Sequence, residues 1–172
     1  MKLHFRRIKT WKTLAYGLYF LLLFLCSHAF LPALLPALPL PNMTIPALCL
    51  LAMTEDGGYA AVFAVVFGAL DAAVLDFATA PLVLFYLLVT LLSAKLFSSL
   101  FSRGFLPWLG YTIGWLVLFA LLMLFSMVSA WQERVGMAFF TEILAQSVSS
   151  LCFAVLTYPL LWRLTRRFSA DG

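Results

Sequence analysis

Residues 66–86 read VFGALDAAVLDFATAPLVLFY, two apolar runs separated by a short polar turn. Asp76 ends the first run, and Thr79 and Pro81 suit the opening of a second helix, because both residue types are favoured there. The rest of the chain is similarly apolar, with 65% hydrophobic and 10% charged residues overall. A soluble domain of 172 residues has too little interior to hide that much apolar surface. The sequence therefore predicts an integral membrane protein.

A spanning helix needs about 20 mostly apolar residues. We expect one all-α transmembrane domain over residues 1–172, with the second and third spans short and joined by a polar turn at residues 55–58. The proline-rich segment 32–46 is predicted to be irregular, lying in the outer interface or dipping back into protein. The six predicted spans are about 13–31, 42–54, 59–76, 80–101, 105–130 and 139–163.

The basic residues orient these spans. With six crossings, every lysine and arginine except Arg134 falls on one side, which the positive-inside rule identifies as cytoplasmic. Both termini are then predicted to be cytoplasmic. The basic tail suits contact with anionic lipid headgroups, and the pattern shows no nucleic-acid footprint. The cations on this side are Lys2, Arg6, Arg7, Lys9, Lys12, Lys95, Arg103, Arg163, Arg166 and Arg167.

The first span has an alternative interpretation as a cleaved secretory signal. Basic residues, the apolar run 14–26 and the small-x-small triplet 27–29 fit that pattern. Cleavage would leave five spans with the same orientation of the C-terminus. We favour an uncleaved helix, because the apolar run continues through Phe30 and Leu31.

The third span carries small residues at four-residue spacing together with two acids. Charges inside a bilayer usually face protein or a water-filled cavity, and small residues let helices approach closely. We therefore expect Asp71 and Asp76 to point into the protein. For Asp76 three interpretations are open: it caps the span, it binds a partner or ligand, or it takes part in transport. For Asp71 two are open: a structural hydrogen-bonding group or a functional group. The small residues in this row are Ala60, Ala64, Gly68 and Ala72.

Two further patterns are typical of helix packing. Polar residues recur at helical spacing in the sixth span, where interhelical hydrogen bonds are the first interpretation and a ligand contact the second. Gly110 and Gly114 form a GxxxG pair in the fifth span, for which we expect close packing inside the monomer rather than a dimer interface. The polar stripe consists of Glu142, Gln146, Ser149 and Ser150.

Motifs for catalysis, nucleotides, cofactors or metals are absent from the sequence, so we expect neither an enzyme nor a bound cofactor. His28 stands alone near the outer interface, and the three cysteines lie singly in apolar segments. Aromatic residues near predicted span ends are typical of an interfacial belt. These residues are Trp108, Trp115, Trp131, Tyr158 and Trp162.

The stretch 66–86 resembles the signature region of MreD, the rod shape-determining membrane protein family of bacteria, which tends to show G-x-x-x-G-x-x-x-D before a small-residue turn. Gly68 and Asp76 match the first glycine and the aspartate, Ala72 replaces the second glycine, and Pro81 fits the turn. Val83 stands where the family usually has a further glycine. The step at residues 41–42 and the arginine-rich helix 149–168 are also similar, so the resemblance covers most of the chain.

The resemblance implies a non-catalytic scaffold of the cell-elongation complex in the plasma membrane. Such a scaffold would bind MreC and help link MreB filaments to the glycosyltransferase RodA and its transpeptidase. It also implies a fold similar to the substrate-binding components of energy-coupling-factor vitamin transporters. The alternative function is therefore substrate capture, with Asp71, Asp76, Glu142 and Gln146 lining a polar pocket near the outer leaflet. A transporter of ions or lipids is disfavoured, because this sequence lacks the internal repeats and the pair of interrupted helices typical of transporters.

Overall fold

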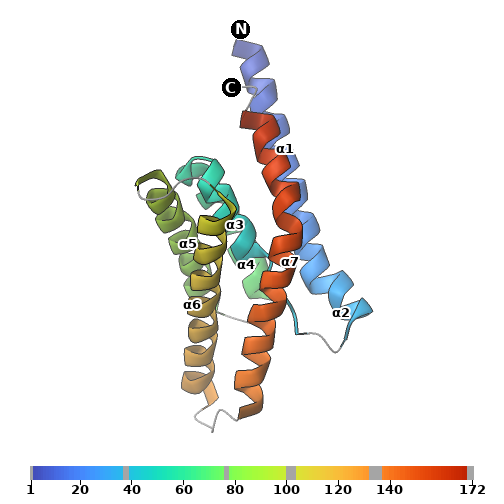
Figure 1. The fold of residues 1–172 in the computed structure, drawn as a ribbon, viewed down its shortest axis with the longest axis vertical. Helices are drawn as coiled ribbons and strands as arrows, with labels where there is room; N and C mark the ends of the chain where they lie inside the picture. The colour runs from blue at the N-terminus through green and yellow to red at the C-terminus, as the bar shows by residue number, and fades with distance from the viewer. Residues whose placement is uncertain (1, 37–38, 76–77, 100–103, 132–136, 170–172) are drawn as a thin grey trace.

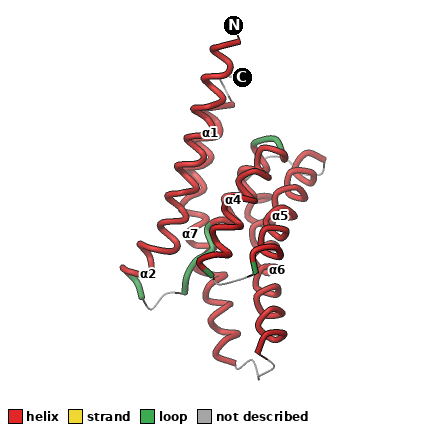
Figure 2. Tube along the Cα trace, turned by 180° about the vertical axis from the view of Figure 1, so that it is seen from behind, coloured by secondary structure: helices red, strands yellow, loops and turns green. Residues whose placement is uncertain are grey.

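The computed structural model describes residues 2–36, 39–75, 78–99, 104–131 and 137–169, and the regular elements in these ranges are all helical. The long helices lie side by side in a bundle (Figures 1 and 2), in agreement with the predicted all-α class. In chain order they are α1 (Lys2–Leu25), the π-helix η1 (Cys26–Phe30), α2 (Leu31–Leu34), α3 (Thr44–Thr54), α4 (Gly57–Val74), α5 (Thr79–Ser99), α6 (Phe105–Trp131) and α7 (Met137–Ser169).

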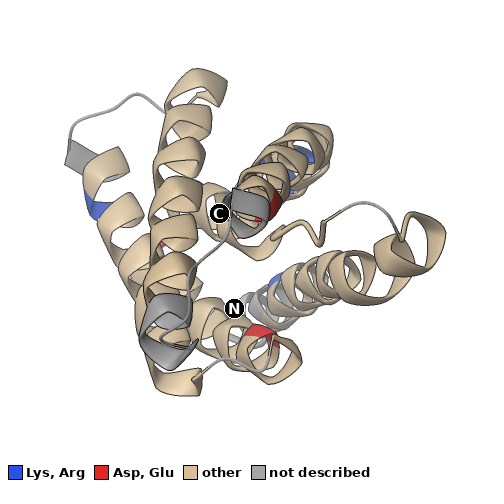
Figure 3. Cartoon of the chain, turned by 90° about the horizontal axis from the view of Figure 1, so that it is seen from below, with Lys and Arg blue, Asp and Glu red and all other residues tan. Residues whose placement is uncertain are grey.

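Within the described residues, five helical stretches are long and apolar enough to cross a bilayer. Few positions along the described helices are Lys, Arg, Asp or Glu (Figure 3). The second predicted span is instead the 11-residue helix α3, which at 1.5 Å per residue reaches roughly half the hydrocarbon thickness. The chain is thus a multi-pass membrane protein by composition and helix length. The five stretches are Thr10–Leu34, Gly57–Val74, Thr79–Phe97, Phe105–Phe125 and Thr141–Arg167.

The first helix continues beyond its predicted end. α1 passes through η1 into α2, so the prediction of irregular backbone from Pro32 onward is wrong for the beginning of that segment. Pro46 lies in the first turn of α3, where its missing N–H breaks no hydrogen bond. Pro32 directly follows η1 inside a continuous helical stretch, and such a π-helical adjustment is one way in which a membrane helix accommodates a proline. The described residues between α2 and α3 form the irregular connection.

α3 is the centre of the bundle. Residues 41–53 are all buried, and α3 contacts α1, α4, α5, α6 and α7. Its length sets it apart from the other helices, because 11 residues are too few to cross the hydrocarbon region, so its ends need protein around them. The other helices therefore pack around a short rod that does not itself cross the membrane.

Two tryptophans predicted for the interfacial belt donate hydrogen bonds to other helices, and one of them is buried. Trp108 is 1% exposed, and its indole N–H donates to the Pro46 carbonyl oxygen over 3.1 Å. Trp115 is half-buried and donates to the Ser93 hydroxyl oxygen over 3.1 Å. Since the protein itself satisfies both indoles, these rings need no polar interface. The belt prediction is wrong for Trp108, which is buried, and stays a prediction for the half-buried Trp115.

Both chain ends lie at the same end of the bundle (Figure 1), because the connection before α3 and α3 itself together return the chain to this end between the first two long helices. At this end Lys12 Nζ lies 2.7 Å from Glu55 Oε2, which ties α1 to the turn between α3 and α4. At the opposite end the α6–α7 hairpin projects beyond α4 and α5 (Figures 1 and 2). The polar turn predicted at residues 55–58 is present, with Glu55 ending α3 and Asp56 preceding α4.

Candidate functional site

Asp71 is the charged residue buried most deeply among those described, at 2% exposed. It lies three residues before the end of α4, on the face that packs against α5 and η1. Tyr86 of α5 donates its hydroxyl to Asp71 Oδ2 over 2.6 Å, and His28 Nε2 of η1 lies 3.0 Å from Asp71 Oδ1. Each carboxylate oxygen thus has a partner from a different helix, as a charge in a bilayer requires.

Asn42 extends this network toward α3 and α7. Its side-chain amide donates to the Tyr86 hydroxyl oxygen over 2.8 Å, and its carbonyl oxygen accepts from the Ile45 N–H at the start of α3. Its backbone N–H donates over 2.7 Å to the hydroxyl oxygen of Ser150, which in turn donates to the Gln146 carbonyl oxygen. We call His28, Asn42, Asp71, Tyr86 and Ser150 the polar network.

The polar network holds five parts of the chain together. Individual hydrogen bonds between membrane helices contribute only about 0.6 kcal/mol on average. A buried ionised carboxylate without partners is far more costly, so the pairing matters most for Asp71. The arrangement explains why η1, the connection before α3, and helices α4, α5 and α7 meet at one level.

A small cavity borders the polar network. His28, Asn42, Asp71 and Gln146 contribute to its lining, together with apolar residues. Its volume of about 10 Å³ is near the minimum that one water molecule needs. His28 Nδ1 is buried and has no hydrogen-bond partner among the described residues. In this conformation the cavity is much smaller than a small-molecule site.

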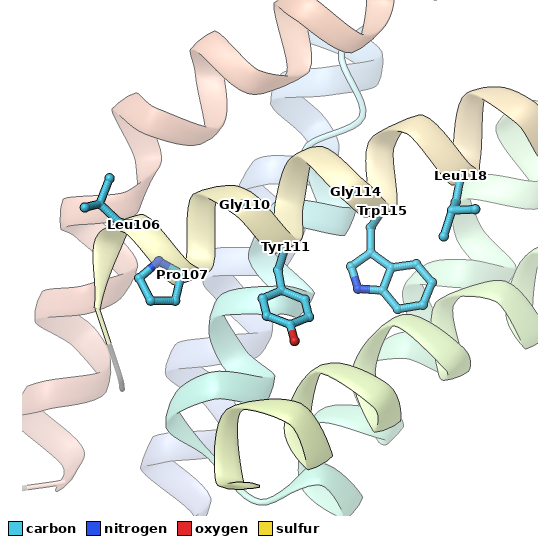
Figure 4. A pocket seen from close by; sticks show the side chains of 7 residues that line it. All are labelled: Leu106, Pro107, Gly110, Tyr111, Gly114, Trp115 and Leu118. Atoms are coloured by element: carbon cyan, nitrogen blue, oxygen red, sulfur yellow. The ribbon is translucent and has the colours of Figure 1, made fainter. Parts of the chain in front are cut away.

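A second candidate site is a groove on the outer face of α6 (Figure 4). Its volume is about 520 Å³ and its lining is almost wholly apolar. Gly110 and Gly114 form its floor: both are exposed, and no other part of the described chain lies within 4 Å of where their Cβ atoms would be. We call this the α6 groove; its lining residues are Leu106, Pro107, Gly110, Tyr111, Gly114, Trp115 and Leu118.

The side walls of the α6 groove are held in place by contacts with α5. Tyr111 packs against Phe97 with ring centroids 4.6 Å apart, and Trp115 is fixed by its hydrogen bond to Ser93. The predicted packing of Gly110 and Gly114 inside the monomer is therefore wrong. The glycines face outward because the large residues beside them, rather than the glycines, fill the contact with α5.

The small-residue row of α4 is packed as predicted. Ala60, Ala64 and Ala72 are at most 1% exposed. A Cβ at Gly68 would lie 3.2 Å from both the Tyr86 ring and the Val83 main chain, so α5 approaches α4 too closely for a larger residue. The row thus places Tyr86 beside Asp71.

The other predicted site residues are scattered. Pro81 is exposed in the first turn of α5, where Thr79 opens the helix as expected. Glu142 is exposed on α7 and does not line the cavity, whereas Gln146 does. Only part of the predicted polar stripe is therefore buried, namely Ser149 and Ser150. Asp76 lies outside the described residues.

Sequence reasoning missed His28, Asn42 and Tyr86 as partners of Asp71. Asp71 itself indicated that hydrogen-bond donors must lie nearby, because a buried carboxylate needs them. His28, at the end of the first predicted span, was a candidate donor, since the only other histidine lies in the basic N-terminus. Nothing in the spacing identified Tyr86 or Asn42. Among the described residues no group of three or more His, Cys, Asp or Glu side chains could hold a metal ion.

No family model, curated protein or solved structure matches this chain.

Proposed function

We propose that this protein is a non-catalytic scaffold of the bacterial cell-elongation complex, located in the plasma membrane with both termini cytoplasmic. It binds MreC within the bilayer, and through MreC it connects with MreB, RodA and the transpeptidase. The proposal rests on the resemblance of residues 66–86 to the MreD family and on the α6 groove.

The α6 groove is the observation that carries the proposal. It occupies about three turns of a helix whose surroundings are apolar, so its natural occupant belongs to the bilayer. A glycine floor allows another helix to approach the α6 backbone closely, and the fixed walls of Tyr111 and Trp115 need no reorganisation when it does. A transmembrane helix of MreC is the partner that we assign to this face.

The polar network serves this function as an internal support. Asp71 has both oxygens engaged by His28 and Tyr86, so the carboxylate joins η1, α4 and α5. The described residues contain no other buried acid. This is the arrangement expected of a rigid platform for partners, and it supports a role without catalysis.

The experiment replaces Gly110 and Gly114 together by leucine. The two side chains would fill the groove while the interior stays intact, so we expect loss of co-purification with MreC and rounding of rod-shaped cells. Gly17→Leu is the matched control, since a Cβ at this helical glycine also meets nothing within 4 Å. Normal cell shape and normal MreC recovery with the double variant would contradict the proposal.

The second candidate function, substrate capture for an energy-coupling-factor transporter, is favoured by one observation. Asp71 and Gln146, two of the four residues predicted for a polar pocket, do line the same cavity. Its present size holds no vitamin, so capture would require the connection before α3 to open. Retention of a vitamin by the purified protein, together with unchanged cell shape on depletion, would favour this function over the scaffold.

A further inference from the structure

A third hollow lies near the end of the bundle that holds the chain termini. It is a cleft of about 480 Å³ between the turn that joins α3 to α4 and the last turns of α5. This volume is within the range of small-molecule sites. Neither the polar network nor the α6 groove shares a residue with it. We call it the interfacial cleft.

The two walls of the interfacial cleft carry opposite charges. Glu55 and Asp56 contribute carboxylates on the turn, where the C-terminal end of α3 adds partial negative charge. Glu55 is already neutralised by Lys12 at 2.7 Å, which leaves the exposed carboxylate of Asp56 as the main negative group. Lys95, exposed on α5, supplies a positive group on the other wall. A ligand with both charges therefore suits the cleft.

The floor and one side of the interfacial cleft are apolar. Met53 and Phe97 are buried beneath the charged walls. Leu91 is 49% exposed and belongs to an outward-facing leucine row on α5 that also includes Leu84 and Leu88. The spacing of these leucines keeps them on one side of the helix. The cleft thus continues into a surface that faces hydrocarbon.

We propose that the interfacial cleft binds the headgroup of phosphatidylethanolamine. Asp56 receives the ammonium group, Lys95 the phosphate, and the acyl chains follow the leucine row of α5. A primary ammonium donates hydrogen bonds to a carboxylate, which the trimethylammonium of phosphatidylcholine cannot do. A lipid fits better than a soluble peptide, because the cleft opens onto the hydrocarbon-facing side of α5.

The test measures, by native mass spectrometry, how much of each lipid stays bound to the whole protein purified in detergent. The lipid series is phosphatidylethanolamine, its mono- and dimethylated forms and phosphatidylcholine, all with the same acyl chains. We expect the three lipids that keep an N–H to be retained and phosphatidylcholine to be retained about tenfold less, because only the last methylation removes the charge-assisted hydrogen bond to Asp56. If the unaltered protein retained all four lipids equally, the proposal would be overturned.

Two variants test the assignment of the walls. Asp56→Asn should weaken the preference for lipids with an N–H, because an amide oxygen accepts without the charge, while phospholipid is still retained. Lys95→Gln should lower retention of every phospholipid in the series. Glu142→Gln is the matched control, since it removes an exposed carboxylate outside the cleft and should leave the series unchanged. An unchanged preference in Asp56→Asn, or capture of a basic peptide in place of lipid, would overturn the proposal.

Discussion

The small-residue face of α4 and the glycine pair of α6 are the same kind of sequence pattern with opposite surroundings. Gly68 is covered by α5, with Val83 and Tyr86 in close contact. Gly110 and Gly114 meet nothing from the rest of the described chain. Small residues at four-residue spacing therefore indicate that a backbone can be approached closely, and the neighbouring large residues decide from which side.

The covered face also carries the polar network, whereas the open face carries almost no polar group. Changes on α4 should consequently damage the fold, and changes on α6 should damage binding while the fold remains. Four predictions, in decreasing order of their effect on stability, test this difference.

Asp71→Ala should have the largest effect. The change leaves His28 and the Tyr86 hydroxyl without their acceptor inside the bundle, and removal of one partner of a buried pair costs about 3–5 kcal/mol. The measurement is thermal unfolding in detergent together with protein level in membranes. Combining Asp71→Ala with His28→Ala should recover part of the lost stability, because the imidazole that has lost its acceptor is then removed as well. Equal stability of Asp71→Ala and the unaltered protein would show that the network is dispensable.

Gly68→Leu should be the next most harmful change. A side chain at this position forces α5 away from α4, and overpacking of this kind costs about 1–3 kcal/mol. Unfolding measurements with Gly17→Leu as the control separate this effect from any general cost of leucine in a helix. A Gly68→Leu protein as stable as the control would mean that the α4–α5 contact is not tight.

Tyr86→Phe should have a smaller effect of about 1 kcal/mol, because it deletes the hydroxyl that bridges Asp71 and Asn42 but keeps the packed ring. The measurement is the unfolding transition of this variant alone and combined with Asn42→Ala. The two changes act on one hydrogen bond, so their effects should add to less than the sum of the separate losses. Full additivity would place the two residues in independent interactions.

Gly110→Leu should leave stability unchanged or raise it slightly, by up to about 1 kcal/mol, because leucine favours a helix more than glycine does and meets no neighbour here. The same variant should nevertheless weaken recovery of MreC. Unfolding and co-purification of one preparation provide the comparison. Destabilisation comparable to that of Gly68→Leu would mean that the open face is packed after all.

Much of the architecture could be predicted from residue types alone. Apolar runs interrupted by Glu55 and Asp56 and by the Thr79–Pro81 step locate α3, α4 and α5 to within a few residues. The burial of Asp71 also followed, because charge in a bilayer must turn toward protein. The prediction gave the prolines too much weight, since Pro46 occupies the first turn of α3 and Pro32 is accommodated directly after the π-helix η1.

The candidate sites were less accessible to such reasoning. His28 and Asp71 are 43 residues apart, and their meeting depends on how η1 turns against α4. Trp108 was expected at the membrane surface because tryptophan often lies there, yet α3 offered the Pro46 carbonyl in the interior. Hydrogen bonds between residues far apart in the chain leave no local sequence pattern from which the partners could be predicted.

By itself, the sequence determined that this protein is a bundle of apolar helices, because hydrophobic composition and helix length depend only on residues adjacent along the chain. Tertiary structure alone decided that the short α3 becomes the centre, that Asp71 joins His28 and Tyr86, and that Gly110 and Gly114 stay open. These outcomes depend on the rotation and depth of each helix against the others. Rotation and depth are set by the fit of many side chains at once, which no single segment encodes.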